Sequence, residues 1–170
     1  MRWTLMALLL VGTQGVASPA PDLSGATSWV RAQSGAEVEA IKAAAVDKAV
    51  KQFSWAIRPF ARPQLEGTTG TCSTYRIHHD ADFHWQCDSH PPNRRTPGTQ
   101  TPFSDGEAGE FTLIMSRSGD SWTADYSKGD SGKRVTWTFV NASRLAVTQE
   151  VYSPQLTTPM RWTVLFKPGP

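Results

Sequence analysis

The chain has 170 residues, of which 19% are charged, and its formal net charge at neutral pH is +2. A chain of this length forms one domain and buries a substantial core. Because its lysines and arginines are scattered, the sequence has no electrostatic footprint for a nucleic acid, and its charge balance implies no acidic or basic partner.

The first twenty residues are typical of a cleavable secretory signal peptide. Arg2 supplies the positive charge, residues 3–11 form an apolar run (WTLMALLLV), and residues 12–20 are small and uncharged. Cleavage is expected between Ala17 and Ala20, which leaves residues 21–170 as a single mature domain. No second stretch of about 20 apolar residues follows, so no membrane span is expected after cleavage. The sequence therefore predicts a secreted or periplasmic protein; the alternative is a buried first helix in a cytosolic one.

The first element of the mature chain is a predicted helix over about residues 35–58. Ser34 and Glu37 have the spacing of a capping box, in which each side chain bonds the other residue's backbone amide. An apolar stripe at helical spacing then runs from Val38 onwards. Pro59 and Pro63 are expected to end the helix.

The chain after Gly67 alternates apolar and polar residues and predicts about 7–8 strands. Turn sequences such as Ser118-Gly119-Asp120 separate them. The pattern favours a mainly β fold, either an antiparallel up-and-down β-barrel or a strongly curved meander, with one N-terminal α-helix. The expected strand centres are 75–77, 83–87, 111–115, 122–126, 135–139, 145–151 and 162–166, with a short strand near 101–103 inside a long loop.

Cys72 and Cys87 are the only two cysteines of the chain. An exported protein meets an oxidising environment, so they predict one disulfide bond in preference to two free thiols. A loop of this length would constrain the unfolded chain by about 3 kcal/mol.

The hairpin that carries these cysteines has two competing registers. If the cysteines lie directly opposite each other, the apolar sets of the two strands point to opposite faces. A shift by one residue aligns Tyr75 with Trp85 and Ile77 with Phe83. We expect the second register, with a β-bulge near residues 71–74 that lets the sulfurs meet.

Two groups of titratable residues are candidates for a catalytic or metal site. His79 and His84 with an aspartate of the same hairpin would be a metal site, but their spacing is not that of metal ligands, and neither metal nor cofactor is expected. Asp105, Glu107 and Glu110 have the residue types of an acid–base pair, yet lie in a glycine-rich connection where carboxylates are ordinary. No nucleophile or phosphate-loop motif occurs, so the chain is expected not to be an enzyme.

Aromatic side chains are the strongest functional signal. Six tryptophans follow the signal region, and several lie at inward positions of the predicted strands. They indicate either a cavity for a small hydrophobic ligand or a core filled by rings. Asn141 begins a glycosylation sequon that matters only in a eukaryotic source. The residues expected in the interior, as candidate ligand contacts, are Trp85, Trp122, Tyr126, Trp137, Phe139 and Trp162.

The layout resembles the lipocalin-like (calycin) group, and in particular short bacterial secreted proteins of uncharacterised function. The motifs that carry the resemblance are LSG at 23–25 with Trp29, ARPQLEG at 61–67 and MRWTVLF at 160–166. The resemblance implies an antiparallel barrel with room for a small apolar molecule. It also implies that Trp29 packs at one end of the barrel beneath Arg161 of the last strand.

Three functions remain open at this point. The first is a non-enzymatic exported barrel that binds a small hydrophobic ligand. The second is a secreted protein-interaction or structural module with a filled core. The third is an enzyme of the NTF2-like kind, in which a helix covers a curved sheet and a pocket carboxylate such as Asp125 acts as general base.

Overall fold

The computed structural model describes residues 25–104 and 109–170, which form one ten-stranded antiparallel sheet and two helices. The proposed signal peptide, Asp105 and Glu107 lie outside the described residues. The strands are β1 (Thr27–Arg31), β2 (Thr74–His79), β3 (Phe83–Cys87), β4 (Asn93–Arg95), β5 (Gln100–Ser104), β6 (Glu110–Ser118), β7 (Ser121–Lys128), β8 (Ser131–Asn141), β9 (Arg144–Tyr152) and β10 (Met160–Pro168).

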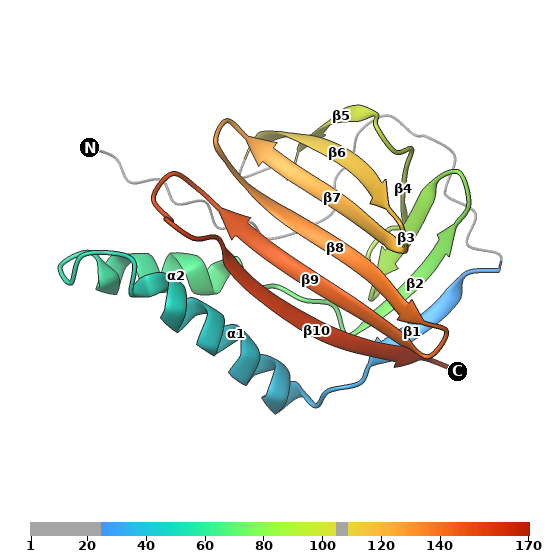
Figure 1. Ribbon diagram of the computed structural model, residues 1–170, viewed down its shortest axis with the longest axis horizontal. Coiled ribbons are helices and arrows are strands. Elements are labelled where there is room, and N and C mark those ends of the chain that lie inside the picture. The colour runs from blue at the N-terminus through green and yellow to red at the C-terminus, as the bar shows by residue number, and fades with distance from the viewer. Residues whose placement is uncertain (1–24, 105–108) are drawn as a thin grey trace.

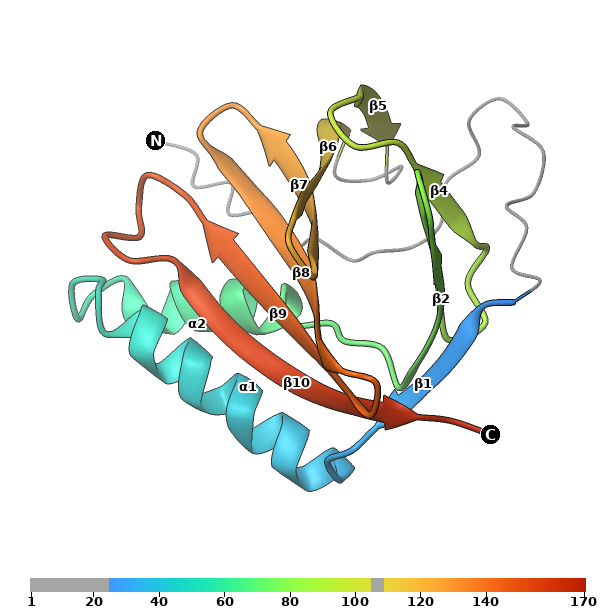
Figure 2. The same ribbon diagram turned by 45° about the vertical axis from the view of Figure 1, so that its right-hand side comes forward.

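The sheet is a meander that curls back on itself (Figures 1 and 2). Its order is β4-β3-β2-β1-β10-β9-β8-β7-β6-β5, so the first strand pairs with both the second and the last. The edge strands β4 and β5 lie on the same side of the molecule, opposite the helices (Figure 1). The mainly β, antiparallel fold is confirmed, as a curled half-barrel.

The structure has ten strands rather than 7–8 among its described residues. The additional strands are β1, with five residues, and β4, with three. Neither shows a long alternation of apolar and polar residues, which is the pattern that predicts a strand. β1 is nevertheless central to the fold, because it joins β2 to β10.

The predicted helix is two helices, α1 (Gly35–Val50) and α2 (Arg58–Gly67). The capping box at Ser34 and Glu37 is present and starts α1. The prediction was wrong about Pro59, which lies in the first turn of α2, where a missing backbone N–H breaks no helical hydrogen bond. No helix in the described ranges is long and apolar enough to cross a membrane.

The disulfide between Cys72 and Cys87 is present, but the hairpin register differs from the predicted one. Tyr75 lies opposite Cys87 and Ile77 opposite Trp85, a shift of two residues that keeps the apolar side chains on one face. The expected bulge at 71–74 is not needed, because β2 begins only at Thr74 and Cys72 precedes the paired residues.

A local cap replaces that bulge. Asp88 adopts a left-handed conformation with φ of 48°. Its carboxylate accepts hydrogen bonds from the backbone amides of Ser73 and Thr74. The cap turns the chain that enters β2 towards Cys87, so the disulfide forms without disturbing the pairing of β2 and β3.

Alternation along β6 to β10 separates an inner face from an outer one. Inward residues such as Leu113, Ala124 and Val164 are fully buried. On the outer face, threonine hydroxyls pair across strands, Thr123 with Thr136 at 3.0 Å. Helix α1 packs against β10 and completes the core with Val38, Val46 and Ala49 among others.

Candidate functional site

The six aromatic residues expected in the interior all belong to or border the buried core. Trp85, Trp122, Tyr126, Trp137 and Trp162 are each at most 5% exposed, and Phe139 packs against the core while partly exposed. Each occupies an inward position of its strand, as the period-two pattern required.

Three of these rings, those of Trp85, Trp122 and Trp137, pack together around Phe83. Phe83 is the centre of the group, with ring centroids 5.0 Å from Trp122 and 4.9 Å from Trp137. Trp85 lies 5.4 Å from Trp137. Such separations are those of aromatic pairs in direct contact. This part of the interior is therefore filled by rings, and the predicted ligand contacts form a packed cluster.

A buried lysine lies on the same inner face. Lys133 of β8 is 0% exposed, and its cross-strand neighbours are Tyr126 and Val151. Its Nζ donates to the backbone carbonyl of Thr68, after α2, at 3.1 Å. The ammonium also lies 5.6 Å from the centroid of the Trp162 ring. Of its three N–H donors, one is therefore used within the described part of the chain.

Desolvation lowers the pKa of Lys133 from 10.5 to about 8, and the positive charge of Lys42 on α1 adds to the effect. At neutral pH the group still carries its proton. The described residues provide no carboxylate partner for it. An uncompensated buried charge is costly, so this ammonium lowers the stability of the fold unless something else supplies a countercharge.

Two unpaired polar atoms lie on the same inner face as this lysine. Trp162 lies directly opposite Gln149 on β9, and both side chains face inward. Trp162 Nε1 and Gln149 Oε1 are buried and have no hydrogen-bond partner among the described residues. The indole N–H of Trp29, towards the other end of β10, also has no partner among the described residues. We call Lys133, Gln149 and Trp162 the Lys133 cluster.

Lys133 was not among the residues predicted for the interior, although the sequence carries a signal for it. Lys133, Val135, Trp137 and Phe139 are two residues apart and share the inner face of β8. Extending the predicted strand backwards by one repeat would have placed the lysine inside. Because Lys133 directly follows the turn sequence at residues 128–132, its place in the sequence instead suggested a solvent-exposed loop residue.

The structure does not bring Trp29 and Arg161 together. Trp29 lies opposite Pro168 at the far end of β10 and packs against Phe139, with centroids 5.9 Å apart. Arg161 points to the outer face and pairs with Glu150 at 2.9 Å. The expectation taken from the resemblance is wrong because the strand register separates the two residues by seven positions along β10.

Asp125 lies on the outer face and not in a pocket beneath a helix. Its carboxylate accepts hydrogen bonds from Arg134 at 2.8 Å and from the Tyr152 hydroxyl at 2.6 Å. Arg134 also pairs with Glu150, which joins this group to Arg161. Both oxygens of Asp125 are thus engaged, which removes the geometry that the NTF2-like alternative required.

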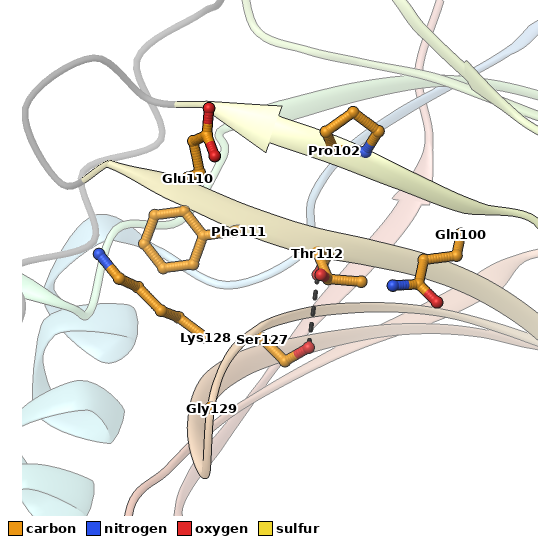
Figure 3. A pocket seen from close by; sticks show the side chains of 8 residues that line it. All are labelled: Gln100, Pro102, Glu110, Phe111, Thr112, Ser127, Lys128 and Gly129. Carbon is orange, nitrogen blue, oxygen red and sulfur yellow. Dashed lines mark hydrogen bonds between the residues drawn. The ribbon is translucent and has the colours of Figure 1, made fainter.

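A depression of about 580 Å³ lies at the end of β6 and β7, apart from the interior (Figure 3). Glu110 lines it, together with Phe111 and Thr112, which accepts a hydrogen bond from Ser127 through its carbonyl. None of the six interior candidates lines it. Its lining mixes polar and apolar groups, which does not suit a wholly apolar ligand. The remaining lining residues are Gln100, Pro102, Lys128 and Gly129.

Comparisons with known proteins identify a similar strand arrangement but no family. No family model matches the chain, and no curated protein matches it. Among solved structures it is similar to the "REP1-NXSQ fatty acid transporter", with 14% identity, TM-score 0.49, and coverage of 88% of this chain and 98% of that one. Further similar solved structures are described as fatty-acid-binding or lipid-binding proteins.

Two further neighbours show the same level of likeness. One is the fatty-acid-binding protein of Drosophila melanogaster brain, with 12% identity and TM-score 0.48 over 82% of this chain and 95% of that one. The other is a secretory abundant heat soluble protein of Ramazzottius varieornatus, with 13% identity and TM-score 0.49 over 89% and 100%. At this level the likeness concerns strand layout alone and says nothing of a ligand.

Proposed function

We propose that the chain is an exported half-barrel that binds a small apolar molecule carrying a carboxylate or another anionic group, with the charge held at Lys133. The observation that carries this proposal is the fully buried ammonium of Lys133, which has no acidic partner among the described residues. A ligand anion would supply the missing countercharge.

The chemistry around Lys133 suits such a ligand. Tyr126, Val151 and Trp162 provide apolar and aromatic surface beside the ammonium. Trp162 Nε1 offers an unused donor for an anionic oxygen. A charge-assisted hydrogen bond to a carboxylate is about twice as strong as a neutral one. Recognition would therefore depend on the anionic group more than on chain length.

A core with only a structural role does not need this lysine. Replacing buried ionic groups by apolar ones of similar volume is often neutral or stabilising in proteins. Retaining an ammonium and the unpaired indole N–H of Trp162 beside it lowers stability, by about 1–3 kcal/mol for each unsatisfied group. A ligand that pairs with them offsets this loss, which favours binding as the reason for their presence.

Tryptophan fluorescence tests the proposal. Trp55 is 82% exposed, so a Trp55→Phe background leaves a signal dominated by buried rings. In this background the protein is titrated separately with decanoate and with decanol, which has the same chain length and no charge, and the two affinities are compared. We expect a saturable response to decanoate and at least tenfold weaker binding of decanol.

The matched variant is Lys133→Met, with Lys167→Met as the control, since Lys167 is exposed on β10. Lys133→Met should weaken decanoate binding at least tenfold, about 1.4 kcal/mol. Lys167→Met should bind as the parent does. Equal decanoate affinity in the parent and in Lys133→Met would refute the role of the lysine.

The competing function is a secreted protein-interaction or structural module with a filled core. The direct ring contacts of Phe83, Trp122 and Trp137 favour it. This function predicts that tryptophan fluorescence shows no saturable response to decanoate, decanol or an apolar dye, which distinguishes it from ligand binding. In that case Lys133→Met would change stability alone.

Export is the second part of the proposal. It is supported by the apolar run at residues 3–11, the small residues that follow it, and the Cys72–Cys87 disulfide. N-terminal sequencing of the protein produced with its full leader should give a mature chain that begins after one of residues 17–20. A product that retains Met1 and stays with the cytoplasm would refute it.

A further inference from the structure

The connection between α1 and α2 exposes two aromatic rings. Trp55 is 82% exposed and Phe60 is 72% exposed, and no other large apolar side chain in the described ranges exceeds 51%. The connection lies at one end of the longest axis of the molecule, away from the C-terminus (Figure 1). Ala56 and Pro59, between the two rings, are exposed as well. We call Trp55, Ala56, Pro59 and Phe60 the aromatic corner.

The winding of the backbone brings these four side chains together. The chain is wound helically through residues 54–61, since the carbonyls at positions 54 and 57 each accept hydrogen bonds from the amides three and four residues later. Residues four apart on such a winding are neighbours. Trp55 therefore lies beside Pro59. Ala56 lies beside Phe60 for the same reason. Contiguous exposed apolar surface, unlike a single exposed residue, indicates an interaction site.

Contacts on both sides fix the conformation of this connection. Phe53, just before the corner, is buried in the core. Arg58 donates from Nε to the Phe53 carbonyl at 3.1 Å. Gln52 accepts hydrogen bonds from the Thr157 hydroxyl at 2.8 Å and from the Thr158 amide at 2.9 Å, both in the loop between β9 and β10. The two rings are therefore held outwards by a fixed scaffold and not by a loose loop.

Basic side chains flank the aromatic corner. Lys48, Lys51 and Arg58 are exposed, and residues 48–60 include no acidic residue. None of these three cations forms an ion pair with another described residue. The segment therefore carries three positive charges that no carboxylate in the described part of the chain neutralises.

The surroundings of the corner add no opposing charge. The nearest acidic residues in the sequence, Asp47 and Glu66, both pair with Arg62. The adjoining loop between β9 and β10, residues 153–159, has no charged residue. This end of the molecule thus presents apolar rings together with net positive charge. Its complement is a negatively charged surface that rings can enter.

We propose that the aromatic corner docks on the surface of a membrane that contains anionic lipids. Tryptophan and phenylalanine rings are favoured between the lipid headgroups and the acyl chains, and nearby Lys and Arg residues are attracted to anionic headgroups. Each side of a stable protein interface uses about 20–30 residues, far more than this corner offers. Lipid binding grows with inserted apolar area and charge and needs no shaped partner, which favours a bilayer.

Vesicle binding tests the proposal. The chain is used without residues 1–20, because the apolar run at residues 3–11 would bind lipid by itself. Vesicles of equal parts phosphatidylglycerol and phosphatidylcholine are compared with vesicles of phosphatidylcholine alone in sedimentation assays. Each basic residue near an anionic surface contributes about fivefold to affinity. We therefore expect at least tenfold tighter binding to the mixed vesicles, weakened by added salt.

Trp55 also reports on docking directly. The five other tryptophans after residue 20 are each at most 5% exposed. A blue shift of the fluorescence on adding mixed vesicles should therefore arise from Trp55, whose ring leaves water. Trp55→Phe should still bind the vesicles and should lose the shift. A shift of the same size in Trp55→Phe would contradict insertion of this ring.

Two apolar variants locate the contact. Trp55→Ala and Phe60→Ala should each weaken binding to the mixed vesicles at least tenfold. The matched control is Val140→Ala, which removes an exposed apolar side chain at the end of β8 and should bind as the parent does. Circular dichroism confirms that each variant is folded. Unchanged binding in Trp55→Ala would overturn the proposal.

Charge variants separate lipid docking from other partners. Lys48→Gln/Lys51→Gln should weaken binding to the mixed vesicles at least tenfold, and Lys167→Gln, an exposed lysine of β10, should not. Lys133→Met should dock as the parent does, so the result does not depend on the proposed ligand. Equal binding to both vesicle types, or no binding to either, would overturn the proposal. Dimers in lipid-free solution that Trp55→Ala abolishes would assign the corner to a second copy of the chain instead.

Discussion

Replacing Lys133 by methionine should make the protein more stable at neutral pH, and the gain should fade in mild alkali. Methionine has a similar length and no charge, and it can pack between Tyr126 and Val151 as the lysine stem does. Burial lowers the pKa of Lys133 from 10.5 to about 8. At about 1.4 kcal/mol per pKa unit, this difference opposes folding by about 3 kcal/mol below pH 8.

The pH dependence follows from the direction of this shift. Below pH 8 both the folded and the unfolded chain hold the Lys133 proton, and the full unfavourable contribution is present. Between pH 8 and 10.5 the unfolded chain binds more protons than the folded one, so the stability of the parent rises with pH. Lys133→Met has no such group. Its advantage therefore shrinks over this window.

The expected size takes one loss into account. Methionine leaves the Thr68 carbonyl without its hydrogen bond, which lowers stability by about 1 kcal/mol. We therefore expect Lys133→Met to be about 2 kcal/mol more stable than the parent at pH 7. This difference should fall by about 2 kcal/mol between pH 7 and pH 9.5.

Urea unfolding at the two pH values measures this difference, with Lys167→Met as the exposed control. The range stops below pH 10 because burial raises the pKa of Tyr126 to about 12. Above pH 10 the unfolded chain loses phenolic protons that the folded chain keeps, and the stability of both proteins falls. If Lys133→Met is less stable at pH 7, or its difference from the parent does not change with pH, the lysine is not a buried uncompensated cation.

Two further predictions concern the scaffold. The double variant Cys72→Ser/Cys87→Ser should lose about 3 kcal/mol in urea unfolding, and a stability equal to that of the parent would show that the bond does not constrain the unfolded chain. Gly132→Ala should lose about 1–3 kcal/mol, because its Cβ would overlap a backbone carbonyl and the Tyr152 ring. Gly70→Ala, where a Cβ meets nothing within 4 Å, is the matched control and should stay within about 0.5 kcal/mol of the parent.

Local patterns predicted those parts of the fold that depend on neighbouring residues. The capping box at Ser34 needs only the side chain three residues later. The strands from β6 to β10 are long enough for alternation to identify their inner faces. For the same reason the inward set from Trp85 to Trp162 was found without knowledge of which strands pair.

Features that depend on distant parts of the chain were not predictable in this way. The register of β2 and β3 depends on a three-residue turn closed by Asp80 and Asp82. A shift of two residues keeps the same side chains on the inner face, so the apolar pattern cannot distinguish the two registers. The position of β1 between β2 and β10 is likewise set by pairing with the chain end, about 140 residues away, and not by its own composition.

The aromatic interior explains why composition alone could not decide between a ligand-binding protein and a module with a filled core. Tryptophans at inward positions fit a cavity and a filled core equally well, because either environment buries their rings. Lys133 separates the two cases, since a buried ammonium lowers the stability of a filled core and gains a partner in a core that binds an anion. A stability gain in Lys133→Met together with a loss of decanoate binding would show that this residue is kept for binding. A stability gain with no ligand response in either protein would leave the filled core as the better account.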